Sequence, residues 1–586
     1  MAALPPTVQK IINDNVYGLP RLPINPLGDT LERYLTSVKP LCTPDEYAAQ
    51  EKLCAEFQNG VGAQLHADLV SEDAHEGYPF SFIEKHWDVM YNGLRCPAPV
   101  NISPFFAIND EKDAKDMVQC ARAAKFVHGF TRWTRKVLAG ELEQDKDMCS
   151  HAYPKHFSSA KIPVKGMDEL AMYPDSRHIT VISNGNVFTL EIVSLEGTIL
   201  EVTGIQAKLE DIVKRAHAEG AGSLPILTAE DRDVWADARA SLEAVDGNKD
   251  KLQAIDAGII AVCLDESPVK AGDLHERAQN LLVGPGSNRW WDKQQLVVDG
   301  SGFMGIVFEH SYGDGTNWGR FINDVMADVE GKLAVMATHE ASAASDAVHV
   351  TLTVPASVQS TIDAAKANYR KLQDDISIEV LDFSSFGKDE IKTWNCSPDA
   401  VLQLAFQAAY FSLHNKMPPV YEACATRKFF HGRTETIRAC TEASTAFCKA
   451  LVSKAPKEEA VALMQSAAKT HSAISKAAAG GMGIDRHLTA MANNAAAKGM
   501  ATPALFADAK FQYAKNWLLS TSNGSGPFLA MFGFAAVIPE GYGLGYLIEN
   551  KKVNIVCTCF NSCKDTDAKQ MAASIANTLN AMCALK

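Results

Sequence analysis

The sequence predicts an α/β protein built in two halves. Segments with helical periodicity alternate with extended segments both before and after about residue 350. The chain has 586 residues. Because a single hydrophobic core stops growing near roughly 250–300 residues, this length favours two cores. The content of 47% hydrophobic and 22% charged residues, with no long biased segment, is typical of a globular protein.

Two hairpin signals stand out in the first half. Residues 177–193 predict a β-hairpin in which Asn184-Gly185 forms the turn, because these residue types accept the positive φ angles of a two-residue turn. Residues 295–310 predict a second hairpin, with Asp299-Gly300 at its turn.

The remaining elements follow from periodicity and capping signals. Ser397-Pro398-Asp399 combines an N-cap residue type with Pro at the first helical position, and so predicts a helix start. We further expect helices over 29–41 and 354–375 and from about Asp565 to the C-terminus, and strands over 377–383 and within 543–560.

Charge and cysteine usage argue against several classes of function. The formal net charge of −14 disfavours binding to nucleic acid or to an anionic membrane surface. None of the fourteen cysteines forms a CxxC pair, and the cluster of Cys557, Cys559 and Cys563 lacks the second pair typical of zinc sites, so no metal site is expected. Reduced thiols favour an intracellular, soluble protein. The N-terminus lacks an apolar signal sequence, and the longest apolar run is too short for a transmembrane segment.

His310 lies at the end of the second predicted hairpin, in a His-x-x-x-Asp-Gly motif that continues to Asp314 and Gly315. Three roles are open for such a histidine: a buried structural group, a metal ligand or a catalytic base. An Asp four residues later can fix the loop, and the Gly permits its tight path. The local pattern by itself favours the structural role.

Cations and hydroxyl groups gather at four later places in the chain. Lys388 and Lys392 lie four residues apart, on one face if helical, and can hold a phosphate as paired charges. A solvated helix face is the simpler interpretation of this pair alone. The other three places are the segments FHGRTETIR, GIDRHL and LLSTSNG.

These segments belong to a longer series of motifs that resembles the carnitine/choline acyltransferase family over nearly the whole chain. The similar motifs are, in order, LPRLPINPLGDTLERYL, YNGLRCPAPVNISP, YPDSRHI, LTAEDRDVWA, GSNRWWDK, FEHSYGDG, SPDAVLQLAFQ, FHGRTETIR, DRHL, STS and PEGYG. Many separate matches in one order are far more specific than the His310 motif alone. The segment FSSAKIP departs from the family's pattern.

The resemblance implies two similar α/β domains, each a mixed β-sheet flanked by helices, with an active-site tunnel between them. One domain is expected to comprise residues 76–350 and to carry the catalytic histidine. The other is expected to comprise residues 1–75 and 351–586 and to carry most of the residues that bind the substrates. The resemblance makes His310 the catalytic base and Ser522 a hydroxyl group beside the reacting carbonyl.

The resemblance also implies a site for CoA, with Lys388 and Lys392 on its phosphates. The residues assigned to CoA are Lys388, Lys392, Ser397, Asp399 and Asn523. Two departures concern the same ligand: an Arg that relatives use for CoA is Ser472 here, and a Ser near CoA is Ala423. We expect these departures to affect the affinity for CoA and not the class of reaction.

The resemblance favours carnitine over choline as the acceptor alcohol. Both carry a trimethylammonium group, but only carnitine has a carboxylate, so its site needs a cation with hydroxyl donors. Arg486, Thr434 and Tyr421 match the family's carboxylate-binding positions, whereas choline-specific members lack the arginine. Phe532 falls where a side chain closes the acyl pocket and long-chain relatives have Gly, so a short acyl group is expected.

The expected activity is therefore reversible transfer of an acetyl group between CoA and carnitine, by direct attack with a histidine base and without an acyl-enzyme. No permanently bound cofactor is expected, because acetyl-CoA is a co-substrate. The alternatives are choline O-acetyl transfer, medium-chain transfer to carnitine, acyl-CoA binding without turnover, and serine hydrolysis, which the absence of a GxSxG elbow disfavours. We expect a monomer in the cytoplasm or mitochondrial matrix, with the peroxisome less favoured and with no nucleic-acid partner.

Overall fold

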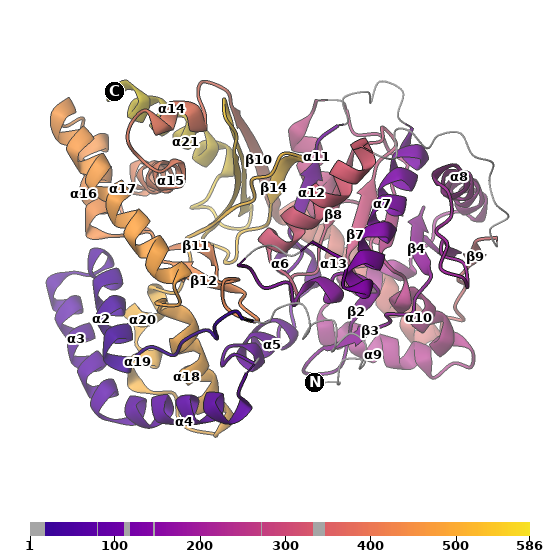
Figure 1. The fold of residues 1–586 in the computed structure, drawn as a ribbon, viewed down its shortest axis with the longest axis horizontal. Helices are drawn as coiled ribbons and strands as arrows, with labels where there is room; N and C mark the ends of the chain where they lie inside the picture. Colours follow the sequence, from indigo (N-terminus) through magenta and orange to yellow (C-terminus); the bar gives the residue numbers. More distant parts are fainter. Residues whose placement is uncertain (1–17, 79, 111–117, 144–146, 271, 332–345) are drawn as a thin grey trace.

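The computed structural model describes residues 18–586 apart from 79, 111–117, 144–146, 271 and 332–345. Two large β-sheets lie side by side, each with helices against it (Figure 1). Both sheets contain parallel and antiparallel pairs, which confirms the α/β class with two mixed sheets flanked by helices. No helix within the described ranges is both long enough and apolar enough to cross a membrane. The N-terminal segment examined for a signal sequence lies outside the described residues.

The first sheet has the strand order β14-β1-β8-β7-β6-β4-β5-β9, in which β6 is parallel to β4 and β7. Its strands are β14 (Leu529–Gly533), β1 (Phe105–Ile108), β8 (Met304–Val307), β7 (Gln295–Val298), β6 (Ala261–Leu264), β4 (His178–Ser183), β5 (Asn186–Glu191) and β9 (Val348–His349). Successive side chains point to opposite faces, so Val181 and Ile182 enter different cores. One face is covered by α7 (Gln119–Ala139), α8 (Val202–Glu219) and α12 (Gly315–Gly331), and the other by α9 (Arg232–Glu243), α10 (Asn248–Ala257), α11 (Leu274–Leu282) and α13 (Ala356–Asp375).

The second sheet has the order β10-β16-β15-β13-β11-β12, in which β13 is parallel to β11 and β15. Its strands are β10 (Ile376–Phe383), β16 (Val553–Phe560), β15 (Tyr542–Ile548), β13 (Leu519–Asn523), β11 (Val420–Ala425) and β12 (Thr434–Ile437). The helices that share its apolar core are α15 (Pro398–His414), α16 (Glu442–Val452), α17 (Lys457–Ala479) and α21 (Ala568–Ala584).

Strand β14 connects the two sheets. It follows β13 in the chain, yet it pairs antiparallel with β1 of the first sheet, where Phe532 lies opposite Phe106. Its backbone crosses β15 so closely that a Cβ atom on Gly545 would be 2.3 Å from the carbonyl oxygen of Phe532. Glycine is therefore needed at this crossing. Because α13 and β14 both follow residue 350 but pack on the first sheet, the boundary near residue 350 stays a prediction.

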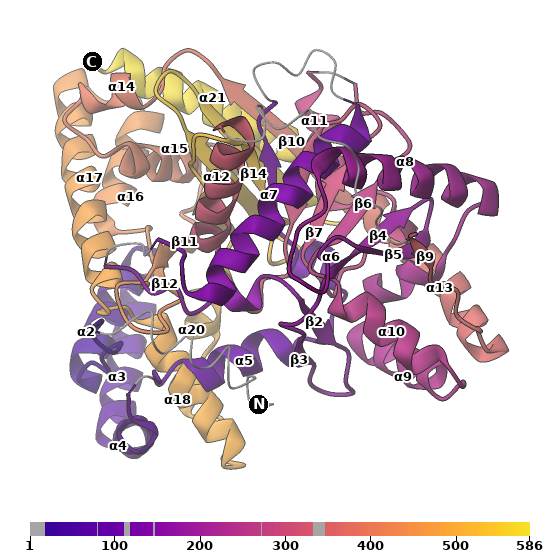
Figure 2. The ribbon, with the colours of Figure 1, turned by 45° about the vertical axis from the view of Figure 1, so that its right-hand side comes forward.

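The N-terminal helices pack against a distant part of the chain. At the lower left of Figure 1, α2 (Leu27–Val38), α3 (Pro44–Asn59) and α4 (Val61–Glu76) share one apolar cluster with α18 (Asp485–Ala497), α19 (Ala504–Ala507) and α20 (Ala509–Tyr513). From there α5 (Glu84–Asn92) runs between the two halves, as the turned view in Figure 2 also shows. The short elements are η1 (Lys39–Leu41), α6 (Ala98–Asn101), η3 (Tyr153–Lys155), β2 (Ser159–Ile162), β3 (Glu169–Met172), η4 (Leu224–Ala229), η5 (Gly286–Asn288) and α14 (Lys388–Lys392).

The elements predicted from local patterns are present. The hairpin β4–β5 turns at Asn184 and Gly185, whose φ angles are 47° and 71°. The helix α15 begins at Pro398 with Ser397 as its N-cap residue. The second hairpin is confirmed, but its turn is longer than predicted and spans residues 299–303, because the Asp299 carboxylate accepts hydrogen bonds from later backbone N–H groups and closes a wider loop.

Candidate active site

A cavity of about 330 Å³ opens between the two halves of the molecule. Its lining from the first half includes Trp87, Tyr91, Val100, Phe308, His310 and Asp314, and its lining from the second half includes Tyr421, Thr434, Arg486, Ser520, Ser522 and Phe532. Residues predicted to act on the alcohol, the carbonyl and the acyl group therefore come from both halves of the chain and line one cavity. This convergence could not be read from their spacing in the sequence.

His310 lies beyond the end of β8, where the chain still pairs with the segment before β1. The backbone N–H of His310 donates to the carbonyl of Ile102 at 3.1 Å, which holds the side chain at the rim of the sheet. Its Nδ1 atom faces the Asp314 carboxylate at 3.8 Å. That distance exceeds a hydrogen bond, as is common in unliganded sites whose contacts tighten when substrate binds.

Arg433 organises this loop from the second half. Its guanidinium donates to both oxygens of Asp314, at 2.8 and 3.2 Å, and to the carbonyls of His310 and Ser311, at 3.0 and 2.7 Å. Burial acts to raise the pKa of Asp314, but the charges of Arg433, His310 and Arg486, together with the hydrogen bonds from Arg433, offset this and hold that pKa below its ordinary value. Asp314 is thus ionised at neutral pH and oriented toward His310.

The imidazole of His310 is neutral at neutral pH. Burial lowers its pKa below the ordinary value, the Asp314 carboxylate acts in the opposite direction, and Arg433 adds to the lowering. A carboxylate facing Nδ1 favours the tautomer that carries the proton on that nitrogen and the lone pair on Nε2. A neutral histidine of this kind can accept a proton from a substrate hydroxyl or thiol.

Strand β13 brings two hydroxyl groups to the cavity. Ser520 and Ser522 are two residues apart and so share one face of the strand, and both line the cavity. The hydroxyl of Thr521 instead donates to the Tyr421 carbonyl at 2.9 Å and accepts from the Gln403 amide at 2.8 Å. These bonds fix the strand in the orientation that exposes the two serines.

Arg486, Thr434 and Tyr421 meet at another part of the cavity wall. The Arg486 guanidinium donates to the Thr434 carbonyl at 2.8 Å, and to the Thr434 and Tyr421 hydroxyl oxygens at 3.2 Å each. All of these acceptors are uncharged groups. Burial acts to lower the pKa of Arg486, but its surroundings raise it above the ordinary value, so the cation persists. The arrangement can bind an anion, because a buried guanidinium with two adjacent hydroxyls offers charge-assisted hydrogen bonds.

Phe532 forms an apolar wall of the cavity. Its ring stacks on Phe106 with centroids 4.6 Å apart at 23°, in the register set by the β1–β14 pairing. A second ring, Phe534, lies 5.6 Å away. Gly524 permits this approach, since a Cβ atom there would be 2.6 Å from Phe106 and 2.8 Å from Phe532. This part of the cavity wall is therefore aromatic.

The residues predicted to bind CoA lie outside the cavity and lead toward it. Lys388 is half-buried and Lys392 is exposed, at the two ends of α14, and neither has an ion-pair partner among the described residues. Ser397 occupies the N-cap position of α15, but its side chain makes no capping hydrogen bond. The Asp399 carboxylate accepts from the Asn523 amide at 3.2 Å, and Asn523 directly follows Ser522. This contact connects the start of α15 with the serine strand.

The two residues that depart from the family's pattern occupy different settings. Ser472 lies on α17, where its hydroxyl donates to the Ala468 carbonyl at 3.0 Å and is occupied within the helix. Ala423 lies on β11 and lines the cavity, where it adds no polar group.

Several residues of the site were missed by sequence reasoning. Trp87 lies with its ring 4.6 Å from the guanidinium carbon of Arg433 and 4.7 Å from that of Arg486. Val100 has a φ of 61°, rare for a β-branched residue and typical of strained functional sites. Lys161, in the departing segment FSSAKIP, donates to the Tyr91 carbonyl at 3.1 Å and the Ser311 hydroxyl at 3.0 Å. That departure was the one local signal for Lys161.

Comparison with known proteins finds sequence similarity over most of the chain. Residues 22–577 match the choline/carnitine O-acyltransferase family. The chain is 33% identical over 576 residues to the mitochondrial carnitine O-palmitoyltransferase 2 of Mus musculus, covering 91% of this chain and 87% of that protein. The human protein of the same name is also 33% identical, over 575 residues with the same coverage. The carnitine O-acetyltransferase of Rattus norvegicus is 30% identical over 577 residues, covering 95% of this chain and 91% of that protein.

Proposed function

The chain belongs to the choline/carnitine O-acyltransferase family, and from this premise we propose that it catalyses the reversible transfer of an acetyl group between CoA and carnitine. The observation that carries the proposal is the cavity between the two halves, where a neutral His310 oriented by Asp314 and a charged Arg486 face one space. A base and an anion-binding cation in one cavity are what an alcohol with a carboxylate requires.

The reaction needs one base and no acyl-enzyme. The hydroxyl proton of carnitine moves to Nε2 of His310 while the hydroxyl oxygen attacks the thioester carbonyl carbon. A C–O bond forms and the carbonyl oxygen takes up the negative charge. Collapse of this intermediate breaks the C–S bond, and the proton on His310 passes to the leaving sulfur. The reverse reaction follows the same path from the CoA thiol, with His310 again as the base.

Ser522 is proposed to donate a hydrogen bond to the negative oxygen of the intermediate. Its place on the cavity face of β13, directly before Asn523, supports this role. Because the charge exists only near the transition state, Ser522→Ala should lower kcat by about 10²–10³-fold with little change in KM. A variant that changed only KM would assign the hydroxyl to substrate binding instead.

Carnitine is proposed as the alcohol because Arg486, Thr434 and Tyr421 present a cation and two hydroxyls to the cavity. Choline has no carboxylate to accept hydrogen bonds from these groups. The relatives named above include palmitoyl- and acetyltransferases, so acyl length must be argued from the cavity. The stacked rings of Phe532 and Phe106 support a short acyl group, because a longer chain would have to displace them.

CoA is proposed to enter from the side of α14 and α15. Lys388 and Lys392 have no carboxylate among the described residues to neutralise them, which leaves their charges available to phosphate. The link from Asp399 to Asn523 supports a path along the start of α15 toward Ser522. CoA and its acetyl ester act as co-substrates, and the proposal needs no permanently bound cofactor.

One assay tests the proposal against its rivals. Thiol release from acetyl-CoA is followed with a thiol-reactive dye in the presence of carnitine, of choline or of neither alcohol. The proposal expects release with carnitine only. Preference for choline would reverse the assignment of the alcohol, release without any alcohol would indicate a hydrolase, and binding of acetyl-CoA without release would indicate a binding protein.

Two matched substrates refine the same assay. Octanoyl-CoA tests the acyl pocket, and equal use of octanoyl and acetyl groups by the parent would overturn the short-chain proposal. Phe532→Gly is the paired variant and should raise use of octanoyl-CoA. Dephospho-CoA tests the lysine pair. The parent should bind it more weakly than CoA, whereas a Lys388→Ala/Lys392→Ala double variant should bind the two about equally.

The working unit is proposed to be one chain, in the cytoplasm or the mitochondrial matrix. The mitochondrial relatives support the second compartment. Light scattering on the purified protein and fractionation of the native cells test these two points.

A further inference from the structure

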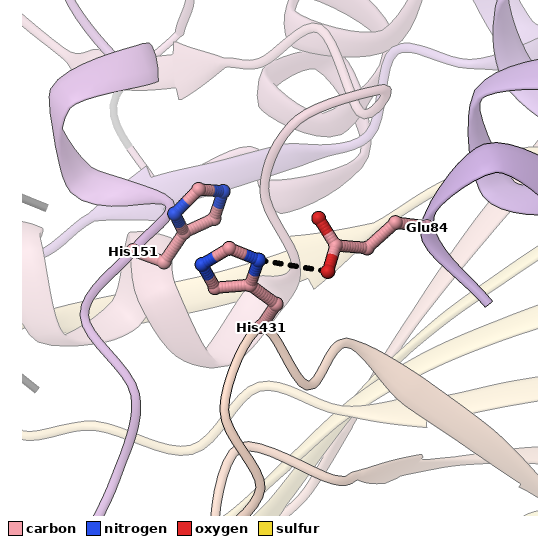
Figure 3. A group of neighbouring side chains, drawn as sticks. All are labelled: Glu84, His151 and His431. Carbon is pink, nitrogen blue, oxygen red and sulfur yellow. Dashed lines mark hydrogen bonds and ion pairs between the residues drawn. The ribbon is translucent and has the colours of Figure 1, made fainter. Parts of the chain in front are cut away.

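A second cluster of functional side chains lies outside the cavity. Glu84, His151 and His431 each offer one ligand atom, and these atoms all lie within 4.8 Å of one another. Figure 3 shows the two imidazole rings beside the Glu84 carboxylate. Glu84 begins α5, His151 precedes η3, and His431 lies in the turn between β11 and β12. The cluster therefore joins segments from the two halves of the chain.

The three side chains already contact one another. Nδ1 of His431 lies 2.7 Å from a carboxylate oxygen of Glu84. The His151 and His431 rings are stacked, with centroids 3.5 Å apart at 28°. The ring of Phe430 stacks on His431, with centroids 4.2 Å apart, and restricts the movement of that histidine. The donors are thus held close together before any ligand binds.

The hydrogen-bonding capacity of the cluster is only partly used. His431 is 4% exposed, and its Nε2 atom has no hydrogen-bond partner in the described part of the protein. Nδ1 of His151 is also buried without a partner. Burying a polar atom without a partner carries a free-energy cost, so the unpartnered nitrogen of His151 beside the Glu84–His431 pair needs an explanation.

Opposite charges are balanced around the cluster. The carboxylates of Glu84 and Asp88 and the cations of Lys155 and Arg433 act on one another here. An ion would therefore be held by the three side chains themselves and not by a local excess of negative charge.

We propose that Glu84, His151 and His431 form a site for one divalent transition-metal ion of the Zn²⁺ type. Two imidazole nitrogens and one carboxylate oxygen suit Zn²⁺, whereas Mg²⁺ and Ca²⁺ prefer oxygen ligands alone. Three protein ligands leave a fourth position for water. The partial exposure of Glu84 and His151 gives the ion a way in.

Binding requires a small rearrangement of the ligands. With metal–ligand bonds of about 2.1 Å, tetrahedral geometry places ligand atoms roughly 3.4 Å apart, so the 2.7 Å contact between His431 and Glu84 must lengthen. The proton now shared between His431 and Glu84 must leave or move to Nε2. The contact therefore marks the position that the ion would take over.

The ion would stabilise the geometry of the active site without touching the reactants. Glu84 begins the helix that carries Trp87 and Tyr91 to the cavity wall. His431 is two residues before Arg433, which holds Asp314 and the His310 carbonyl. A metal bridge between Glu84 and His431 would tie these two parts of the site together across the halves of the molecule.

Metal binding is tested on the untagged full-length protein after treatment with EDTA and its removal. Zn²⁺ is titrated by calorimetry, and Co²⁺ is used as a probe because it gives a visible d–d spectrum in a tetrahedral site. We expect one ion per chain with a Kd below about 10 μM, and a rise in Tm of at least about 2 °C at saturating Zn²⁺. No stoichiometric binding below that limit would overturn the proposal.

Three variants locate the site. Glu84→Gln keeps the size of the side chain, His151→Phe keeps the ring stack, and His431→Asn keeps a residue type that accepts the φ of 54°. Each should weaken Zn²⁺ binding at least about 100-fold and abolish the Co²⁺ spectrum. His275→Gln, at an exposed histidine on α11, is the control and should bind like the parent. Equal binding by the parent and Glu84→Gln, whose fold is checked by circular dichroism, would reject the site.

Discussion

The half-buried Arg433 and the buried Arg486 lie beside the same tryptophan, and they differ in the groups that their charges face. The guanidinium carbons of Arg433 and Arg486 lie 4.6 and 4.7 Å from the ring of Trp87. Arg433 is paired with Asp314 through both carboxylate oxygens. Arg486 donates to a carbonyl and two hydroxyls. Glu435 and Asp485 act on its charge, but within the described residues no carboxylate accepts a hydrogen bond from its guanidinium.

From this difference we propose that Arg433 organises the site and that Arg486 binds the substrate. A buried charge that is already paired contributes to the native structure, and removing one partner leaves the other uncompensated. A buried charge without a counterion is costly unless a ligand supplies one. Glu435 is a neighbouring acid, but its carboxylate accepts a hydrogen bond from the backbone N–H of Arg486 and not from the guanidinium. Burial raises the pKa of Glu435 to about 7, although the charge of Arg486 lowers it. Within the described residues the guanidinium of Arg486 thus bonds only to uncharged groups, and the carboxylate of carnitine is the proposed partner of its charge.

The largest expected effect falls on His310, the proposed base, whose loop Arg433 and Asp314 hold. His310→Ala should lower kcat by about 10²–10⁴-fold, because an unassisted alcohol is a poor nucleophile. Steady-state kinetics of CoA release measure this, with CoA affinity and Tm as controls for folding. Retention of most of the activity would show that another group removes the proton.

Removing the paired arginine should act on stability. Arg433→Gln leaves Asp314 buried without its counterion and should cost about 3–5 kcal/mol in the free energy of unfolding. Because the pKa of Asp314 is lowered in the folded state, this contribution is present above its unfolded pKa of about 4 and is lost as the pH falls through the folded value. Urea denaturation at neutral and acidic pH measures both parts.

The matched double variant adds Asp314→Asn to Arg433→Gln. It should recover part of the lost stability, since no buried charge is then left unpaired. A double variant as unstable as the single one would mean that the bonds from Arg433 to the two backbone carbonyls matter more than the ion pair.

Removing the unpaired arginine should act on substrate binding. Arg486→Asn should raise the KM for carnitine about ten- to two-hundred-fold, because a hydrogen bond to a charged group contributes about 1.5–3 kcal/mol. Choline, which lacks the carboxylate, should lose nothing. Kinetics with both alcohols, beside a Tm for each protein, test the contrast. If Arg486 only joined helices, the variant would lose activity with both alcohols and its Tm would fall as well.

The smallest expected effect is a displacement of the pH profile. His310 must be neutral to act as a base, so kcat/KM should fall on the acid side with a midpoint below the ordinary histidine pKa of about 6.5. Asp314 raises the pKa of His310, and Arg433 lowers it. Asp314→Asn should therefore move the midpoint to lower pH and also weaken the base. Rates measured from about pH 5 to about pH 8 reveal the direction, and a shift to higher pH would contradict the assigned electrostatics.

Local elements were predictable because their causes are local. The turn at Asn184 and Gly185 depends on φ angles that these residue types accept, and the start of α15 depends on Ser397 and Pro398 as neighbours. The longer turn after β7 was missed, because Asp299 closes it by side-chain bonds that compete with the two-residue turn.

The candidate site was predictable only through motifs that resemble a family. Those motifs named His310, Ser522, Arg486 and Phe532, all of which line the cavity, while their catalytic and binding roles remain predictions. Trp87 was not named, because no local pattern distinguishes an aromatic residue beside two arginines from an ordinary core residue.

By itself, the sequence determined the elements that depend on neighbouring residues and the residue types available for chemistry. Only the tertiary structure decided which of them meet. Phe532 stands beside Phe106 because the chain leaves the second sheet after β13 and forms β14 in the first, and Gly545 permits that crossing. Glu84, His151 and His431 come together because α5 runs between the two halves. The physical reason is that such contacts are set by the packing of whole layers, which brings together residues hundreds of positions apart and leaves no periodic trace in the sequence.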